Sequence, residues 1–390
     1  MIAISANRLY SPLEEIDRPF LLVEGERIVE VGSQVAREIP HYAQLVDYGD
    51  SVLAPGFIDI HIHGGGGHDV MEADEASLPA VERLLAAHGV TSYFPTTVTA
   101  SIDRTLSALE RLANAIESAQ LDGARGRRAQ PLGIHLEGPF ISHVRRGVHP
   151  PQDLLPATLP MFERFWQAAR GHIRVMTIAP ELEAAREVIA EASRRGVCVS
   201  LGHSDANLQS TRAAVDAGAR HATHAFNAMR PLDHREPGIV GEILTDSRLS
   251  ADIIADGIHV DPTVVDLFLR MKGPEAAVLI TDATAATGMP DGRYRLGSLE
   301  VEVKAGRCTA EGRLAGSVLT MDRAIRNVME FGRCNLRQAL RLATLNPARV
   351  AGLANRGKLE AGTNADIVVL SPRGEVRTTI IRGAAQAAGS

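Results

Sequence analysis

Short apolar runs alternate with helix-like segments through the middle of the chain. Eight runs rich in aliphatic residues, each of strand length, lie at 57–63, 91–98, 132–138, 174–180, 197–204, 220–226, 250–259 and 277–283. Helical periodicity is found between most of them, at 77–89, 101–119, 182–196, 207–219 and 262–273, and later at 322–332 and 336–352. Eight strands that alternate with helices over this length predict a (β/α)₈ barrel of the TIM type.

A doubly wound open sheet is the alternative architecture. Such a sheet is expected to carry a glycine-rich phosphate loop, G-x-G-x-x-G, between its first strand and the next helix. The glycine run after the first predicted strand reads HGGGGHD and does not fit that pattern. The barrel is therefore the preferred fold.

The two ends of the chain have a different pattern from the middle. Residues 1–53 and 355–390 consist of short strand-like segments separated by Gly and Asn turns. We expect both ends to pair into one small β domain that flanks a barrel domain at 54–354. A glycine-rich stretch at 287–317 predicts a hairpin insertion that folds back over the barrel mouth.

The first predicted strand carries an unusual set of polar residues, in GFIDIHIHGGGG at 56–67. Side chains alternate between the two faces of a strand, so Asp59, His61 and His63 point one way and the isoleucines the other. The two histidines can be paired metal ligands, or they can simply be hydrogen-bonded to neighbours. This stretch alone leaves both readings open.

Polar residues recur at the ends of the predicted strands. The first strand ends in His61 and His63, and later strands end in His135 and Glu137, His203, His224, His259, and Asp282. In (β/α)₈ barrels the chemistry takes place at the C-terminal strand ends. A single histidine there is more often a core residue, but the whole set predicts a metal-dependent site. Imidazole and carboxylate ligands without thiolate suit Zn²⁺, Fe²⁺, Mn²⁺ or Co²⁺.

The ligand types also indicate a reaction. A bound divalent ion lowers the pKa of water and polarises a carbonyl group. Hydrolysis then requires a base for the water proton and an acid for the leaving group, and Asp282 could serve as both in turn. The chain has no G-x-S-x-G nucleophile elbow, so an acyl-enzyme is not required.

Composition excludes several classes of partner. The formal net charge is −6, which gives no basic footprint for nucleic acid. We expect no signal peptide, because no basic segment precedes a long apolar run at the start, and no membrane span. Cys198, Cys308 and Cys334 are widely spaced and odd in number, as expected in a reducing cytoplasm.

Motifs over nearly the whole chain resemble one family. PGFIDIHIHG and GKLEAGTNADIVVL resemble the amidohydrolase superfamily. Within it, HLEGPF, RRGVHP, LGHS, THAFNAM, REPG, DGIHV, TDA and LAGS are similar to the N-acetylglucosamine-6-phosphate deacetylases. The resemblance implies a β-sandwich built from both termini, a homodimer or homotetramer, and metal-dependent removal of acetate from N-acetyl-D-glucosamine 6-phosphate, which yields D-glucosamine 6-phosphate.

The resemblance also implies roles for single residues. The metal ligands are Glu137, His203 and His224, and His61 and His63 can serve a second ion that Glu137 bridges to the first. Asp282 is the general acid and base, and His149 helps to polarise the amide carbonyl. The implied substrate contacts are His149, Asn227, Ala228, Arg235, His259, Leu314, Ala315 and Gly316. Arg235 acts within its own subunit or across a subunit interface.

Three alternatives remain. Many other amidohydrolases use a carboxylated lysine on the fourth strand, but 174–180 contains no lysine. A deacetylase for the galactosamine epimer differs by one hydroxyl group, which the sequence does not resolve. A non-catalytic sugar-phosphate-binding protein would be expected to lose ligands or Asp282, and this chain keeps them. His41, His88, His172 and His221 are predicted to be structural or on the surface, and His68, His135, His143 and His234 have no assigned role.

Overall fold

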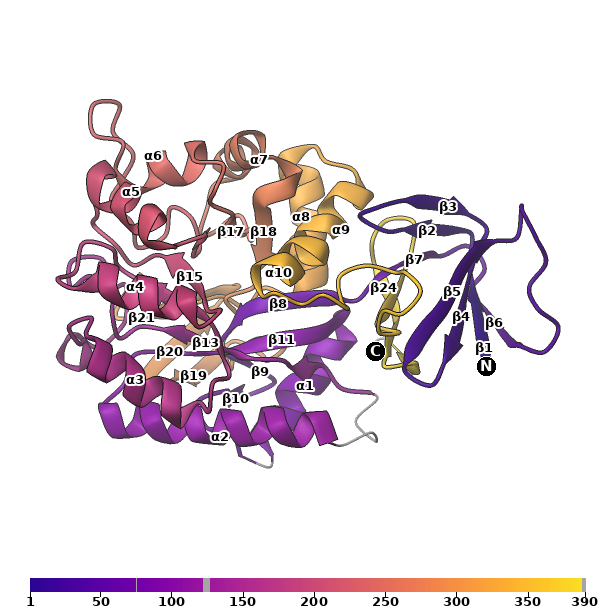
Figure 1. Cartoon of the computed structure of the whole chain (residues 1–390), viewed down its shortest axis with the longest axis horizontal. Coiled ribbons are helices and arrows are strands. Elements are labelled where there is room, and N and C mark those ends of the chain that lie inside the picture. Colours follow the sequence, from indigo (N-terminus) through magenta and orange to yellow (C-terminus); the bar gives the residue numbers. More distant parts are fainter. Residues whose placement is uncertain (75, 122–126, 388–390) are drawn as a thin grey trace.

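The computed structural model describes residues 1–74, 76–121 and 127–387 (Figure 1). Residue 75 and residues 122–126 of the predicted barrel domain, and residues 388–390 of the predicted terminal domain, lie outside this description. Figure 1 shows two lobes, a barrel surrounded by helices and a smaller β lobe that contains both chain ends.

Eight parallel strands form the barrel, as predicted. In chain order they are β8 (Phe57–Ile62), β11 (Val90–Thr97), β13 (Ile134–Glu137), β14 (Ile173–Ile178), β15 (Cys198–Leu201), β16 (His221–Ala222), β17 (Ala251–Ile254) and β18 (Ala277–Ile280). Strands β8 to β16 pair in sequence, and β17 pairs with β18. The remaining gaps are closed by backbone bonds from Ala225 N to Asp252 O (2.9 Å) and from Asp282 N to His61 O (3.0 Å).

Helices cover the outside of the barrel. They are α1 (Ser77–Ala87), α2 (Ile102–Leu121), α3 (Leu159–Ala168), α4 (Ala185–Arg194), α5 (Leu208–Ala217), α6 (Gly238–Thr245), α7 (Pro262–Ala276), α8 (Met321–Gly332), α9 (Leu336–Ala343) and α10 (Leu345–Val350). The predicted helix at 336–352 is divided at Thr344, whose backbone is not helical (φ −131°, ψ −83°). None of the helices in the described part of the chain is both long and apolar enough to cross a membrane.

The smaller lobe is a β-sandwich, and it contains strands from both termini. One sheet has the order β5 (Arg27–Ser33), β4 (Pro19–Glu24), β1 (Ile2–Ser5), β6 (Gln44–Asp47). The other has the order β25 (Ala384–Ala387), β24 (Val376–Ile381), β23 (Ile367–Leu370), β7 (Val52–Pro55), β2 (Arg8–Tyr10), β3 (Glu15–Asp17). Leu21, Ile28, Ile367 and Val369 are fully buried between them. The division of the chain at 53 and 355 stays a prediction.

An insertion after β18 covers part of the barrel mouth. It is a four-stranded antiparallel sheet of β19 (Gly292–Leu296), β20 (Leu299–Lys304), β21 (Arg307–Ala310) and β22 (Arg313–Leu314), rather than a simple hairpin. Its first turn is held by the buried carboxylate of Asp69, which accepts a 2.5 Å hydrogen bond from Gly297 N. A Cβ at Gly297 (φ +59°) would lie 2.4 Å from Val98, so this close approach requires glycine.

Candidate active site

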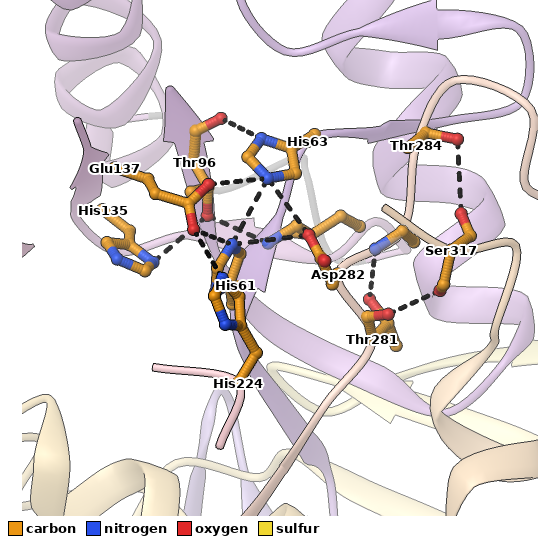
Figure 2. A network of polar contacts seen from close by, with 12 residues as sticks. His61, His63, Thr96, His135, Glu137, His224, Thr281, Asp282, Thr284 and Ser317 are labelled. Carbon is orange, nitrogen blue, oxygen red and sulfur yellow. Dashed lines mark hydrogen bonds and ion pairs between the residues drawn. The ribbon is translucent and has the colours of Figure 1, made fainter. Parts of the chain in front are cut away.

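The polar residues predicted at the strand ends converge in one cavity (Figure 2). Figure 2 shows His61, His63, Glu137, His224 and Asp282 pointing toward one another. The cavity has a volume of about 190 Å³. It is lined by His63, Val98, Glu137, Gly147, Val148, His149, His203, His224, Asn227, Ala228, His259, Asp282, Leu296, Leu314 and Gly316.

Glu137, the last residue of β13, lies at the centre of the cluster. Its Oε1 is 3.3 Å from His203 Nε2 and 3.2 Å from His224 Nε2. The same oxygen is 3.3 Å from His61 Nε2, and Oε2 is 3.2 Å from His63 Nε2. One carboxylate therefore contacts four histidines, which come from the ends of three strands, β8, β15 and β16.

A second carboxylate completes the group around β8. Asp282 Oδ1 lies 3.1 Å from His63 Nε2 and 3.5 Å from His61 Nε2. The two histidine Nε2 atoms are 3.3 Å apart. His61, His63 and Asp282 thus form one cluster, which Glu137 joins to His203 and His224.

These spacings fit divalent metal ions. With Zn–N bonds of 2.0–2.1 Å, two ligand atoms on a tetrahedral zinc ion are about 3.3 Å apart. His61 and His63 match this value, and His203 Nε2 and His224 Nε2 are 3.0 Å apart. Two imidazole nitrogens this close, facing a buried carboxylate, share either a proton or a metal ion. The donor set is therefore suited to one or two divalent ions.

The outer nitrogens of two histidines support the same assignment. His63 Nδ1 is 3.0 Å from Thr96 O, and His203 Nδ1 is 3.1 Å from Arg145 O. A carbonyl oxygen only accepts, so each Nδ1 carries the proton and each Nε2 keeps its lone pair for a metal. His61 Nδ1 and His224 Nδ1 are buried, and they have no hydrogen-bond partner within the described part of the chain.

His149 lies in the same cluster but has the opposite tautomer. Its Nε2 is 3.7 Å from Glu137 Oε2, and ligand atoms of His149, Glu137 and His203 all lie within 4.8 Å of one another, close enough to hold one metal ion. However, its Nδ1 accepts a hydrogen bond from Thr99 N (3.3 Å), so the proton is on Nε2. Burial and the nearby His203 lower the pKa of His149 to about 3, which keeps the ring neutral. Nε2–H is then a hydrogen-bond donor rather than a ligand.

The electrostatics of the cluster favour cations. Burial opposes ionisation of Glu137 and Asp282, but the surrounding histidines outweigh it and lower the pKa of both carboxyl groups. Burial likewise opposes charge on His224, yet Glu137 outweighs it and raises the pKa of His224 to about 9. Two ionised carboxylates are therefore held in a buried site that requires positive charge, from protons or from metal ions.

Backbone strain is concentrated at the same strand ends. His203 (φ +47°), His224 (φ +30°), Ala228 (φ +49°) and Asp282 (φ +50°) all adopt the left-handed region, which is uncommon for residues other than glycine. Such conformations persist where the surrounding structure determines them, and they cluster at functional sites.

Most of the predicted substrate contacts line the cavity. Asn227, Ala228, His259, Leu314 and Gly316 do so. His259 Nδ1 is bonded to Asp256 Oδ2 at 2.7 Å, which leaves its Nε2 available.

Two predicted substrate contacts lie elsewhere. Ala315 is 1% exposed and packs into the core of the insertion, so only its backbone could meet a ligand. Arg235 is exposed and is not among the residues that line the cavity. Its backbone N donates to Asp233 Oδ1 (2.8 Å), and its guanidinium forms no hydrogen bond or ion pair with any described residue.

A layer of hydroxyl and carboxyl groups below the cluster was not predicted. Thr281 Oγ1 donates to Asp59 Oδ2 (2.6 Å), and Ser317 Oγ donates to Thr281 O (2.6 Å). Ser317 N donates to Asp282 O at 2.7 Å, so this layer fixes the end of the eighth strand (Figure 2). Serine and threonine occur in many contexts, and no sequence signal distinguishes these.

His135, which has no role assigned from the sequence, packs against His61 behind the cluster. Its Nδ1 donates to Ile60 O (3.1 Å), and its Nε2 accepts from Thr177 Oγ1 (2.7 Å). Burial lowers its pKa well below the usual value, so the ring is neutral. It packs edge-on against His61 with the ring centroids 4.6 Å apart, and both of its nitrogens are already used.

Comparison with known proteins agrees with this geometry. Residues 52–385 match the amidohydrolase family. The chain is 37% identical to the N-acetylglucosamine-6-phosphate deacetylase of Bacillus subtilis, over 95% of this chain and 93% of that protein. It is 40% identical to the N-acetylgalactosamine-6-phosphate deacetylase of Escherichia coli O157:H7, over 85% and 87% of the two chains.

A solved structure extends the likeness to the whole fold. The N-acetyl-D-glucosamine-6-phosphate deacetylase of Mycobacterium smegmatis, solved as a variant in complex with N-acetyl-D-glucosamine-6-phosphate, superposes with a TM-score of 0.92 at 36% identity. The match covers 98% of each chain. The chain therefore belongs to the amidohydrolase family.

Proposed function

We propose that the protein hydrolyses N-acetyl-D-glucosamine 6-phosphate to D-glucosamine 6-phosphate and acetate. The observation that carries the proposal is the placement of Asp282 and the Nε2–H of His149 around one cluster of metal-ligand atoms, inside a cavity suited to a small molecule. The two relatives named above, with their deacetylase activities, support the same reaction.

The chain's own residues divide the reaction between them. Glu137, His203 and His224 would hold a divalent ion, which would lower the pKa of a bound water and polarise the substrate carbonyl group. His149 donates its Nε2–H to that oxygen. Asp282 is ionised and takes the proton of the attacking water, then delivers it to the departing sugar nitrogen, so no covalent acyl-enzyme forms.

A direct assay tests the reaction. Purified protein loaded with Zn²⁺ or Fe²⁺ is expected to release acetate and a free amine in equal amounts from N-acetyl-D-glucosamine 6-phosphate. Protein treated with a chelator and assayed without added metal is the control. No release with any of Zn²⁺, Fe²⁺, Mn²⁺ or Co²⁺ would contradict the proposal.

We place the reaction in the cytoplasm, in agreement with three free cysteines.

The galactosamine epimer is the second candidate substrate. The Escherichia coli relative, which is named for that epimer, is as similar to this chain as the relatives named for glucosamine. Comparing kcat/KM for the two epimers under the same metal loading decides between them. We expect the glucosamine epimer to be preferred, and the reverse order would transfer the proposal to the galactosamine substrate.

The cluster is proposed to hold a second ion between His61 and His63. Changing both histidines to Gln is expected to lower the metal content by about one ion per chain after saturation, and to reduce activity without abolishing it, because Glu137, His203 and His224 remain. Elemental analysis of metal-loaded protein measures this. His68→Gln, in the same loop but outside the cavity lining, is the control. Equal metal content in the double variant and the wild type would show that the pair are not ligands.

Arg235 is proposed to bind the substrate phosphate in a neighbouring subunit of a dimer or tetramer, since it is exposed and does not line the cavity of its own chain. Arg235→Ala is expected to lower kcat/KM for the phosphorylated sugar roughly 10- to 100-fold, as for the loss of a charged hydrogen bond. Activity on unphosphorylated N-acetylglucosamine, which we expect to be low in the wild type, should change little. Arg248→Ala, another exposed arginine, is the matched control.

Mixed assemblies test the location of Arg235. Subunits with Arg235→Ala and subunits with Asp282→Asn are each expected to have low activity alone. If Arg235 serves a neighbour, mixing them creates sites with both native residues, and activity returns. If mixing restores nothing while hybrids form, Arg235 does not act across an interface.

A further inference from the structure

Asp252 is a buried carboxylate on β17 that contacts the metal-ligand strand end next to it. Its side chain is fully enclosed in the barrel, at 1% exposure. Oδ1 accepts a short hydrogen bond from the backbone N–H of His224. The carbonyl oxygen of Asp252 accepts a second bond from Ala225 N at 2.9 Å. Asp252 therefore holds two consecutive residues at the end of the sixth strand.

The bond to His224 acts where the backbone is strained. His224 has φ +30°, which is unfavourable for a residue with a Cβ and persists only where the surrounding structure determines it. Apart from Nε2, which faces Glu137, the His224 ring has no anchor, because Nδ1 has no partner among the described residues. His63 and His203 are held differently, since each donates Nδ1–H to a carbonyl oxygen. The orientation of His224 thus depends on its backbone.

Two further residues orient the carboxylate. His221 Nε2 lies 2.9 Å from Asp252 Oδ2, and His221 Nδ1 lies 2.7 Å from Ser250 Oγ. His221 is fully buried, and Ser250 Oγ also lies 3.2 Å from Arg220 O. These contacts fix both oxygens of Asp252, so that Oδ1 is directed at His224.

We propose that Asp252 is a positioning residue for the metal ligand His224, and that His221 and Ser250 orient it. The inference rests on the proposed metal-dependent function. Asp252 contacts the main chain of the ligand rather than the substrate or the ion. Its loss should therefore act on metal affinity first, and on turnover only through the metal.

Zinc affinity measured by chelator competition tests the proposal, with metal content measured by elemental analysis. Asp252→Ala is expected to weaken binding of the ion at Glu137, His203 and His224 by roughly 10- to 100-fold, the usual effect of losing an outer partner of a ligand. Asp252→Asn should fall between wild type and Ala, because its amide oxygen can still accept from His224 N–H. Asp366→Ala, a buried carboxylate of the sandwich paired with Arg356, is the control and should alter thermal unfolding only.

Activity provides a second readout. The kcat of Asp252→Ala at limiting Zn²⁺ should be low and should recover with excess Zn²⁺, with KM for the sugar unchanged, whereas a purely structural defect is not rescued by metal. Wild-type zinc affinity in Asp252→Ala would overturn the inference. If that variant does not fold, Asp252→Asn and His221→Gln decide the matter, and wild-type affinity in both would overturn it. Absence of zinc binding by the wild type would instead refute the proposed function.

Discussion

Replacing Asp282 with asparagine is expected to lower kcat by about 10³- to 10⁴-fold. General acid and base catalysis contributes roughly 10²- to 10⁴-fold in rate, and in the proposed mechanism one carboxylate performs both proton transfers. Asparagine has nearly the same shape but cannot accept a proton from water. Asparagine also tolerates the left-handed backbone that Asp282 adopts (φ +50°), so the strand end should keep its conformation.

Metal content separates this role from a purely structural one. Asp282 contacts His61 and His63, whereas Glu137 contacts every histidine of the cluster, so the ion at Glu137, His203 and His224 should remain bound in the variant. Steady-state kinetics and elemental analysis of the same preparation are therefore needed together. A variant that keeps more than a tenth of wild-type kcat with its metal in place would remove Asp282 from the mechanism.

The barrel and the core of the site could be predicted because both follow from simple periodicities. Alternating strands and helices fix the order of the elements, and parallel strands bring all their C-terminal ends to one rim. Residues at these strand ends could therefore be expected to meet, although the first and the last of them are 221 residues apart in the sequence. They are His61, His63, Glu137, His203, His224 and Asp282. A resemblance was still needed to choose among the roles of the ligands.

Other features depend on contacts that leave no periodic signal. Helix α6 is buried on nearly all sides, so its residues show no polar face from which a helix could be recognised. From the sequence, His221 is predicted to be structural or on the surface. Only its position between Asp252 and Ser250 points to the role proposed for it, which is to orient Asp252. Asp59 shares a face with His61 and His63, yet its partner Thr281 is 222 residues away.

The location of Arg235 shows a different limit. Its motif, REPG, suggests a substrate contact, but in a single chain the side chain is exposed outside the cavity. A residue that serves a neighbouring subunit has no partner within its own fold. A contact of this kind is therefore found by the mixed-subunit experiment, which tests directly whether Arg235 acts on a neighbouring subunit.

Glu137→Gln is expected to have an effect comparable to that of Asp282→Asn, but through the metal. Both oxygens of Glu137 face histidine nitrogens at 3.2–3.3 Å, and an amide would place an N–H group against one set of them. The NH₂ group cannot ligate, and the negative charge that attracts cations is lost. Losing about 4 kcal/mol of the stabilisation that a metal provides corresponds to about 10³-fold in kcat.

The metal content distinguishes this prediction from a general loss of structure. Because Glu137 joins the two clusters, Glu137→Gln should lower the metal content at both, whereas the His61 and His63 double variant should lose only one ion. Glu242→Gln alters another buried carboxylate, paired with Arg212 outside the cavity, and should keep the wild-type metal content and kcat. If Glu137→Gln binds as much metal as the wild type after loading, the carboxylate is not needed to hold the ions, and the bridging role proposed for Glu137 is wrong.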